Sequence, residues 1–454
     1  MIGLEDALEK MRADGAQPVA VDTFRHYYER LEAGEQGVIR EDEIEPVDDL
    51  PRLEDLPRTD LEDVLDEAVV IKLNGGLGTG MGMTQAKSLL EVKDGLTFLD
   101  VIVKQVLALR ASSGARIPLV LMNSFATRDD SLAALRAHEG VEADVPLDFV
   151  QNRVPKIRAD ESLAPVEWPA DPEKEWAPPG HGDLYPALVA SGMLETLLDA
   201  GYRYAFVSNA DNLGATLDPR ILSWIAREEV PFLVEVAARS EQDRKGGHLA
   251  RRRGDGLVLR ESAQTADEDV LAFQDITRHR YFNTNTLWID LRALKYTLDG
   301  HGGVLPLPMI VNRKTVDPAD KSSPAVIQLE SAMAAAIDVF EGGQALIVDK
   351  SRFAPVKATN ELLIVRSDAY ELTEDAHLEL VPDRHGVAPL VELDPDYYKL
   401  IADFDARFPS GPPSLVEASR LRVVGDVLFG AGVVVRGSVT VSGPRRVADG
   451  EVLS

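Results

Sequence analysis

The sequence predicts an α/β domain followed by a short parallel β-helix. Between about residues 68 and 370, short runs of β-branched and apolar residues alternate with segments of helical spacing. This alternation is typical of a mostly parallel sheet that is covered by helices on both faces. From Leu421 onward, apolar residues recur every six positions instead, which is typical of the stacked coils of a parallel β-helix.

The α/β domain begins with the run AVVIKL at residues 68–73, which stops at a glycine-rich segment. Further strands are expected at residues 117–122, 204–207, 232–236, 286–289 and 346–348. One helix is expected to start after Thr97 and to run to about Ala111, because the Thr97 hydroxyl can cap it and Asp100 stands at its third position. Other helices are expected at residues 129–138, 184–198 and 327–340.

Three sets of residues make up the C-terminal repeat, and we expect residues 371–454 to form a domain around it. Two sets are apolar and are expected to point inward, whereas the third is small and suits the corners of the coils. The sets are Leu421, Val427, Val433 and Val439; Val423, Phe429, Val435 and Val441; and Gly425, Ala431, Gly437 and Gly443. An antiparallel stack of hairpins is the alternative.

Residues 1–67 are predicted to form two helices and an acidic connection that wraps over the body of the protein. Residues of helical spacing define one face of each helix: Leu4, Leu8 and Met11, and then Phe24, Tyr27, Tyr28 and Leu31. From Glu41 the chain is acidic and carries three prolines, which favours an extended path. Its apolar side chains can anchor it: Leu50, Leu53, Leu56, Leu61 and Leu65.

Composition excludes several classes of function. The 454 residues include 48 Lys and Arg against 76 Asp and Glu, and a net charge of −28 argues against a nucleic-acid-binding protein. The absence of cysteine excludes disulfides, cysteine-ligated zinc, iron–sulfur clusters and a thiol nucleophile. No apolar run has the length of a membrane span, and the first residues lack the pattern of a secretory signal. We therefore expect a cytoplasmic protein with no nucleic-acid or membrane partner.

The glycine-rich segment after the first strand indicates a nucleotide site. LNGGLGTGMGMTQAKS spans Leu73–Ser88 and has five glycines between Gly75 and Gly82. This density lets backbone N–H groups approach a phosphate without obstruction, and Lys87 follows at the end of the segment. Ala86 stands where a P-loop has glycine, and no register fits the G-x-G-x-x-G dinucleotide fingerprint. The segment therefore suggests a third type of nucleotide site.

This segment resembles the signature of eukaryotic-type UTP–glucose-1-phosphate uridylyltransferases, also called UDP-glucose pyrophosphorylases. The resemblance continues, in the order of that family, from about residue 70 to about residue 430. Its further blocks are GLTFLDVIVKQV, MNSFAT, QNRVPKI, WAPPGHGDLYP, YAFVSNADNLGAT, KGGHL, FNTNTLWIDL, QLESAMAAAI and SRFAPVKATNELL. The chain departs from the family at Gln85-Ala86, where Gly-Pro is usual.

The resemblance implies a Rossmann-like nucleotidyltransferase domain of mixed sheet at residues 68–370 and a left-handed β-helix after it. The implied reaction joins UTP and glucose 1-phosphate to give UDP-glucose and pyrophosphate. Its nucleophile is already an anion, so catalysis is expected to rest on positioning and on positive charge rather than on a general base. Lys87 and Lys357 are implied to be catalytic, and Asp211, at the end of a strand, to bind Mg²⁺.

The remaining site residues divide between the two substrates. The residues implied to bind UTP are Leu73, Asn74, Gly75, Gly76, Lys87, Gln151, Gly180, Asp211 and Lys357. Gln151 is suited to the uracil edge because its amide both donates and accepts hydrogen bonds. The residues implied to bind glucose 1-phosphate are His181, Asn209, Ala210, Asp211, Gly247, Glu261, Asn283 and Asn285.

Two other functions fit parts of the sequence. A sister enzyme that acts on N-acetylglucosamine 1-phosphate, or on several sugar phosphates, is less favoured because Asn74 and the FNTNTLW block match the glucose enzyme better. A non-catalytic UDP-sugar sensor or scaffold is less favoured because Lys87, Asp211 and Lys357 are all present. The β-helix suggests self-association into a homo-oligomer.

Overall fold

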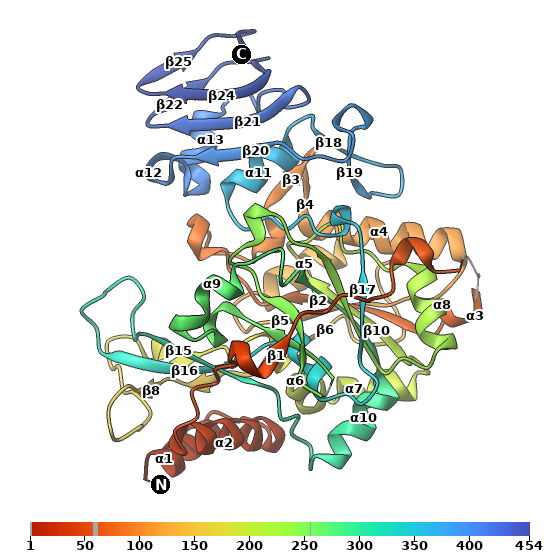
Figure 1. Cartoon of the computed structure of the whole chain (residues 1–454), viewed down its shortest axis with the longest axis vertical. Helices are drawn as coiled ribbons and strands as arrows, with labels where there is room; N and C mark the ends of the chain where they lie inside the picture. Colours follow the sequence, from red (N-terminus) through yellow and green to blue (C-terminus); the bar gives the residue numbers. More distant parts are fainter. Residues whose placement is uncertain (1, 58–61, 255) are drawn as a thin grey trace.

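A computed structural model describes residues 2–57, 62–254 and 256–454 of the chain. A large α/β body occupies the centre, the N-terminal helices lie at one end, and the C-terminal strands stack at the other end (Figure 1). In the described part of the chain, no helix is long and apolar enough to cross a membrane.

The central sheet has a parallel part made of four strands. In order they are β10 (Tyr204–Asn209), β2 (Ala68–Asn74), β5 (Leu119–Asn123) and β6 (Asp148–Val150). Because these strands run in the same direction, Asn209, Asn74, Asn123 and Val150 end at one edge of the sheet. Open α/β sheets bind their ligands at this carboxyl edge.

The other part of the sheet is largely antiparallel. The long strand β14 (Tyr281–Asp290) runs against β10, against β11 (Phe232–Ala238) and against β12 (His248–Arg252). Beyond it, β12 pairs with β13 (Leu257–Arg260) and with β1 (Ile44–Glu45), and β11 pairs in parallel with β17 (Gln344–Ile347). The mixed sheet that the resemblance implied is therefore confirmed, but the expectation that it is mostly parallel is wrong. An apolar run shows that a strand is buried but carries no signal for its direction.

Helices cover both faces of this sheet. Val70 belongs to a core cluster with residues of α4 (Phe98–Ser113) and α8 (Pro219–Arg227). Its neighbours Val69 and Ile71 belong to a second cluster with α6 (Leu184–Ala190), α7 (Met193–Asp199) and α10 (Leu291–Gly300). Successive residues of a strand point to opposite faces, so a strand buried on both faces is apolar throughout.

Most of the expected helices are confirmed, and their ends follow local chemistry. Thr97 caps α4, and its side chain and that of Asp100 exchange hydrogen bonds with each other's backbone N–H as expected. The segment expected at 129–138 is α5 (Arg128–Arg136). The single helix expected at 184–198 is two helices, α6 and α7, since Gly192 between them has φ +74°.

The helix expected at 327–340 is wrong. Residues Ala325–Ser331 form the strand β16, which pairs antiparallel with β15 (Met309–Thr315) and with β8 (Ile157–Arg158). Only a 3₁₀ helix, Met333–Asp338, follows. The ladder between β15 and β16 is seven residues long, and this distant partner overrides the local helical spacing.

The N-terminal segment contains the two helices expected there. The helices α1 (Ile2–Ala13) and α2 (Pro18–Glu32) bury Leu8 and Phe24 in the same core cluster as α6. In the connection, a short helix α3 (Glu62–Leu65) precedes β2, and Leu53, Leu56 and Leu65 are buried. Leu50 is half-buried, and Leu61 lies outside the described residues.

The C-terminal strands form three small parallel sheets. One contains β20 (Leu390–Leu393), β21 (Ala418–Val424) and β24 (Gly437–Ser442), and the others pair β22 (Val427–Phe429) with β25 (Arg445–Val447) and β23 (Val434–Val435) with β26 (Val452–Leu453). Leu421 faces Val439, Val427 faces Arg445 and Val434 faces Val452, so β21, β22 and β23 each face a strand 18 residues further along the chain. All pairings within these three sheets are parallel, which excludes the hairpin stack.

The remaining described α-helices and strands are α9 (Val270–Phe273), α11 (Thr359–Arg366), α12 (Pro395–Tyr398), α13 (Ile401–Arg407), β3 (Glu91–Lys93), β4 (Leu96–Thr97), β7 (Val154–Pro155), β9 (Trp176–Ala177), β18 (Tyr370–Leu372) and β19 (Leu378–Leu380).

Candidate functional site

The glycine-rich segment leaves the carboxyl edge of the sheet directly after β2. The Lys87 N–H donates to the Gly76 carbonyl at 3.0 Å, which folds the segment back on itself. Gly78 and Gly82 have φ of +64° and +76°, which favour glycine. Ala86 has φ −53°, close to the value that proline imposes, so the loop keeps this conformation without the proline usual in the family.

The Asn74 side chain points into the protein and not toward a ligand. Its amide nitrogen donates to Asn123 Oδ1 at 2.8 Å and to Ser131 Oγ at 2.7 Å, and the residue is buried. These bonds tie the end of β2 to the end of β5 and to α5. Only the backbone of Asn74 is therefore available to the predicted nucleotide.

Lys87 and Asp211 form an ion pair. Lys87 Nζ donates to Asp211 Oδ2 at 2.7 Å, and the two side chains keep 17% and 22% of their surface exposed. Asp211 follows the end of β10, where the Ala210 N–H donates to the Leu73 carbonyl at 3.1 Å and Asn209 faces Leu73 in the ladder. Two parallel strands that are adjacent in the sheet thus bring together the lysine of one loop and the carboxylate of the other.

The segment that carries Lys357 is fastened to the same loop. The Val356 N–H donates to the Asp211 carbonyl at 3.1 Å. The Asn212 side chain donates to the Arg352 carbonyl at 3.2 Å and accepts from the Ala354 N–H at 2.9 Å. Lys357, one residue beyond Val356, is exposed. Lys87, Asp211 and Lys357 therefore come from three separate loops that meet at one place.

A buried ion pair between Arg352 and Glu235, which the sequence patterns did not predict, lies next to the segment that carries Lys357. Arg352 donates to both carboxylate oxygens of Glu235 at 2.7 and 2.6 Å, and Trp288 Nε1 donates to Glu235 at 2.9 Å. Glu235 is fully buried in β11, and Arg352 also donates to the Thr216 carbonyl at 2.9 Å. A glutamate inside the apolar run PFLVEVA was the available signal, because a buried charge needs a partner.

Lys72 is a further buried charged residue within an apolar run, and the sequence patterns did not single it out. Its Nζ donates to Ser208 Oγ at 2.7 Å and to the Ala215 carbonyl at 2.8 Å. Burial, together with the nearby charge of Arg352, lowers the pKa of Lys72 to about 7. These bonds tie β2 to both ends of the loop that carries Asp211.

Gln151 lies against Gly75 at the ends of β6 and β2. The Gln151 N–H donates to the Asn123 carbonyl at 2.8 Å. A Cβ on Gly75 would lie 2.7 Å from Gln151 Oε1, so a larger residue there would displace the Gln151 amide from its present position. Gly75 and Gln151, which were both predicted to bind UTP, therefore lie side by side.

Gly180 and His181 form a turn that packs on the end of β16. Gly180 has φ +80°, and a Cβ there would lie 2.5 Å from the Ser331 carbonyl oxygen. The Met333 N–H donates to His181 Nδ1 at 3.0 Å. Burial lowers the pKa of His181 to about 4, so the ring is neutral near pH 7. Because Nδ1 accepts a hydrogen bond, the proton is assigned to Nε2, which makes that nitrogen a donor.

The four candidates for the sugar pocket lie together. The Asn283 N–H donates to the Gly247 carbonyl at 3.1 Å, and Asn283 Nδ2 donates to Asn285 Oδ1 at 2.9 Å. A Cβ on Gly247 would lie 2.5 Å from Glu261 Oε2. Burial raises the pKa of Glu261, whereas a hydrogen bond from Asn283 and the charge of Lys357 act in the opposite direction. The influence of Lys357 on Glu261 places this group near Lys357.

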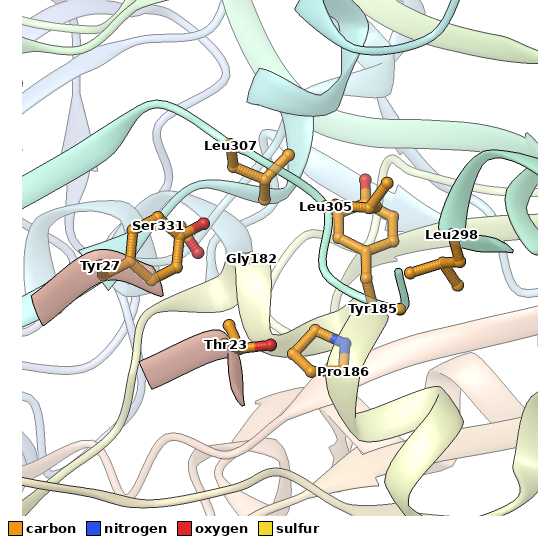
Figure 2. Close-up of a pocket in the computed structure, with 10 residues that line it drawn as sticks. Thr23, Tyr27, Gly182, Tyr185, Pro186, Leu298, Leu305, Leu307 and Ser331 are labelled. Atoms are coloured by element: carbon orange, nitrogen blue, oxygen red, sulfur yellow. The ribbon is translucent and has the colours of Figure 1, made fainter. Parts of the chain in front are cut away.

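Figure 2 shows a separate pocket that is lined in part by Gly182, the residue after the Gly180–His181 turn. It lies between Thr23 and Tyr27 of α2 and Tyr185 and Pro186 of α6. None of the sequence-predicted site residues lines it. It is therefore distinct from the place where Lys87, Asp211 and Lys357 meet.

Asp211 is suited to a magnesium ion whose other ligands are mainly substrate phosphates and water. In the described ranges, no group of three or more acidic or histidine side chains could enclose a metal ion. Mg²⁺ commonly takes one or two carboxylates and completes its coordination with phosphate and water oxygens. The partly exposed Asp211 carboxylate at the strand edge suits that mode of binding.

Comparisons with known proteins agree on one family. A family model described as UTP–glucose-1-phosphate uridylyltransferase matches residues 21–436. A UTP–glucose-1-phosphate uridylyltransferase of Solanum tuberosum is 42% identical over 417 residues, which cover 90% of this chain and 85% of the relative.

Solved structures agree over the whole chain. A variant of UDP-glucose pyrophosphorylase from Leishmania major in complex with UDP-glucose superposes with a TM-score of 0.94 at 45% identity, covering 100% of this chain and 98% of that one. A UDP-glucose phosphorylase structure from Trypanosoma brucei gives a TM-score of 0.92 at 45% identity, with 100% and 98% coverage.

Proposed function

The chain belongs to the UTP–glucose-1-phosphate uridylyltransferase family, and we propose that Lys87, Asp211 and Lys357 are the centre of its active site. The activity of the family produces UDP-glucose from UTP and glucose 1-phosphate. The observation that carries the assignment is the meeting of three loops: Lys87 bonds to the Asp211 side chain, and Val356, next to Lys357, bonds to the Asp211 backbone.

The two lysines counter the repulsion between the reactants. A phosphate oxygen of glucose 1-phosphate attacks the α-phosphorus of UTP in line, and pyrophosphate leaves from the opposite side. Attacker and target are both anions, and the whole chain carries a net charge of −28. Lys87 and Lys357 approach the α-phosphate from different loops and stabilise the charge that builds up on its oxygens. No side chain has to remove a proton.

Asp211 is the residue proposed to hold Mg²⁺. When bound, the ion supplies further positive charge at the phosphates. The carboxylate also orients the Lys87 ammonium through the bond of 2.7 Å. Asp211 thus links a positively charged side chain to the metal position.

The uridine part of UTP is proposed to lie over the loops that follow β2 and β6. Gln151 reads the uracil edge through its amide, and Gly75 leaves the space for this contact. The residues proposed to complete the nucleotide site are Leu73, Asn74 and Gly76, through their backbone, and Gly180, against the base.

The sugar phosphate is proposed to lie between the His181 turn and the group around Glu261. Neutral His181 donates from Nε2 to a phosphate oxygen, while its Nδ1 is held by Met333. Asn209 and Ala210 flank the phosphate. Glucose hydroxyls are proposed to bind Gly247, Glu261, Asn283 and Asn285, which lie in one hydrogen-bonded group.

We also propose a division of labour along the chain. Residues 1–67 wrap the catalytic domain, residues 68–370 form it, and residues 371–454 form a domain that ends in a left-handed β-helix. Support for the β-helix comes from the spacing of 18 residues in the last three strand pairings, which is three of the six-residue repeats. The stacked strands are proposed to provide a surface for a homo-oligomer. A cytoplasmic location suits a chain that has no cysteine to oxidise.

Release of pyrophosphate from UTP with a panel of sugar 1-phosphates tests these assignments. We expect release that depends on added Mg²⁺, is abolished by a chelator and is fastest with glucose 1-phosphate. Preference for the N-acetyl sugar would favour the sister enzyme. UTP binding without pyrophosphate release would favour the sensor.

A further inference from the structure

Asp183 is a buried residue whose carboxyl group binds Asn152, in the loop after β6 that also carries Gln151. Only 4% of the residue is exposed. Asp183 Oδ2 accepts the Asn152 N–H at 2.6 Å, and Oδ1 accepts Asn152 Nδ2 at 2.9 Å. The two residues belong to different segments of the chain, one after β6 and the other before α6.

Each of the two residues in this contact lies close in sequence to a residue that is proposed to bind a substrate. Gln151 directly precedes Asn152, and His181 lies two residues before Asp183. The Asp183 N–H donates to the Gly180 carbonyl at 3.2 Å, which fixes the carboxylate to the Gly180–His181 turn. The turn itself is held against β16, because the Ser331 N–H donates to the carbonyl of Pro179, next to Gly180, at 3.0 Å. The pair of bonds therefore transmits the position of this turn to the loop of Gln151.

Burying this carboxylate is costly for the fold. Burial raises the pKa of Asp183 to about 7, although both bonds from Asn152 act in the opposite direction. A neutral side chain could fill the same space without this penalty. An aspartate side chain offers two oxygens, and here each accepts one of two donors from the same residue. Such a bidentate contact fixes both the place and the orientation of the Asn152 backbone.

We propose that Asp183 is a positioning residue for UTP, which sets the Gln151 amide at the distance and angle that the uracil edge requires. It acts through Asn152 and does not touch the substrate. This inference rests on the proposed role of Gln151.

Calorimetric titration of the full-length protein with UTP tests the inference together with steady-state kinetics. The variants are Gln151→Ala, Asn152→Ala, Asp183→Asn and the double variant Gln151→Ala/Asp183→Asn. Asn152→Ala removes one of the two bonds from the half-exposed partner and keeps the buried carboxylate, so it serves if Asp183→Asn folds poorly. We expect Asn152→Ala and Asp183→Asn each to weaken UTP binding about tenfold, the effect of losing one hydrogen bond to a charged group.

Non-additivity separates positioning from a structural role. If Asp183 acts through Gln151, the fold-loss of UTP affinity in the double variant is smaller than the product of the fold-losses in the two single variants. The difference should be about threefold or more. Asp290→Asn is the matched control, because Asp290 is also buried and accepts two backbone N–H groups, but lies at the opposite edge of the sheet. It should lower the melting temperature and leave UTP affinity unchanged.

Two results would overturn the inference, and they are distinguishable. If Gln151→Ala weakens UTP binding but Asp183→Asn and Asn152→Ala do not, or if the losses multiply, Asp183 has no positioning role. If Gln151→Ala itself leaves UTP affinity unchanged, the proposed role of Gln151 is wrong, and the inference that depends on it is overturned with it.

Discussion

Replacement of Lys357 by alanine isolates the contribution of one positive charge to catalysis. Lys357 is exposed, and its segment is held by other residues, since Val356 bonds to Asp211 and Asn212 bonds to Arg352 and Ala354. Removing the side chain therefore leaves the backbone contacts of the loop in place. We expect the free energy of unfolding to change by no more than about 0.5 kcal/mol, as for other surface substitutions.

The expected loss of turnover is large in comparison. Removing one group that stabilises developing negative charge typically lowers kcat by about 10² to 10³, or about 2.7 to 4 kcal/mol of transition-state stabilisation. Loss of a charge that acts mainly in the transition state should lower kcat more than it raises KM for UTP. A continuous assay of pyrophosphate release measures both quantities.

The same variant makes a second prediction, about pH. The charge of Lys357 opposes the rise that burial causes in the pKa of Glu261. Without the lysine this pKa rises further, so Glu261 becomes protonated at a higher pH and can no longer accept a hydrogen bond from a sugar hydroxyl through both oxygens. The acid limb of the kcat/KM profile for glucose 1-phosphate should therefore move to higher pH.

Lys104→Ala is the matched control, because Lys104 is an exposed lysine on α4. It removes the same charge from the protein and should leave kcat and the pH profile unchanged. The reasoning is refuted if Lys357→Ala turns over like the wild type, or if Lys104→Ala reduces kcat to the same extent.

Three further substitutions probe the support of the site. Glu235→Gln leaves the Arg352 charge buried without its partner and should cost about 3 to 5 kcal/mol of unfolding free energy, measured by urea denaturation. Gly180→Ala has to adopt φ +80° and avoid the Ser331 carbonyl at 2.5 Å, so we expect a loss of about 1 to 3 kcal/mol and reduced activity. Asp183 keeps its proton up to a pKa of about 7 when folded but loses it near 3.8 when unfolded, so its contribution to stability falls as the pH rises between about 4 and 7. In Asp183→Asn this fall should disappear, and an unchanged slope of unfolding free energy between pH 5.5 and 7 would contradict the assignment.

Local patterns in the sequence were sufficient where the deciding interaction is itself local. The capping of α4 by Thr97 and Asp100 involves residues three positions apart, and it was predictable from the sequence. The six-residue repeat is also local in origin, because each period places one residue of each kind at the same position of a coil. The cap is confirmed because no distant partner competes with it, and the repeat is reflected in parallel pairings between residues 18 positions apart.

The failures occurred where a distant partner decides. The segment Ala325–Ser331 has helical spacing, but its seven-residue ladder with β15 makes it a strand. The direction of β14 could not be inferred, since an apolar run is the same in parallel and antiparallel sheets. Glu235 and Lys72 were passed over within apolar runs because their partners, Arg352 and Ser208, lie more than a hundred residues away.

By itself, the sequence supplied the candidates for the chemistry: a glycine-rich loop with its lysine, an aspartate at a strand end and a second lysine far along the chain. The glycine-rich loop was recognisable from its residues alone, because it is a contiguous stretch with its own backbone requirement, whereas the resemblance to the family pointed to the aspartate and the second lysine. Only the tertiary structure decided that Lys87 bonds to Asp211 and that Val356 holds the loop of Lys357 beside them. The physical reason is that β2, β10 and β17 run in the same direction in one sheet, and this arrangement depends on strand pairing across the whole domain rather than on any local segment.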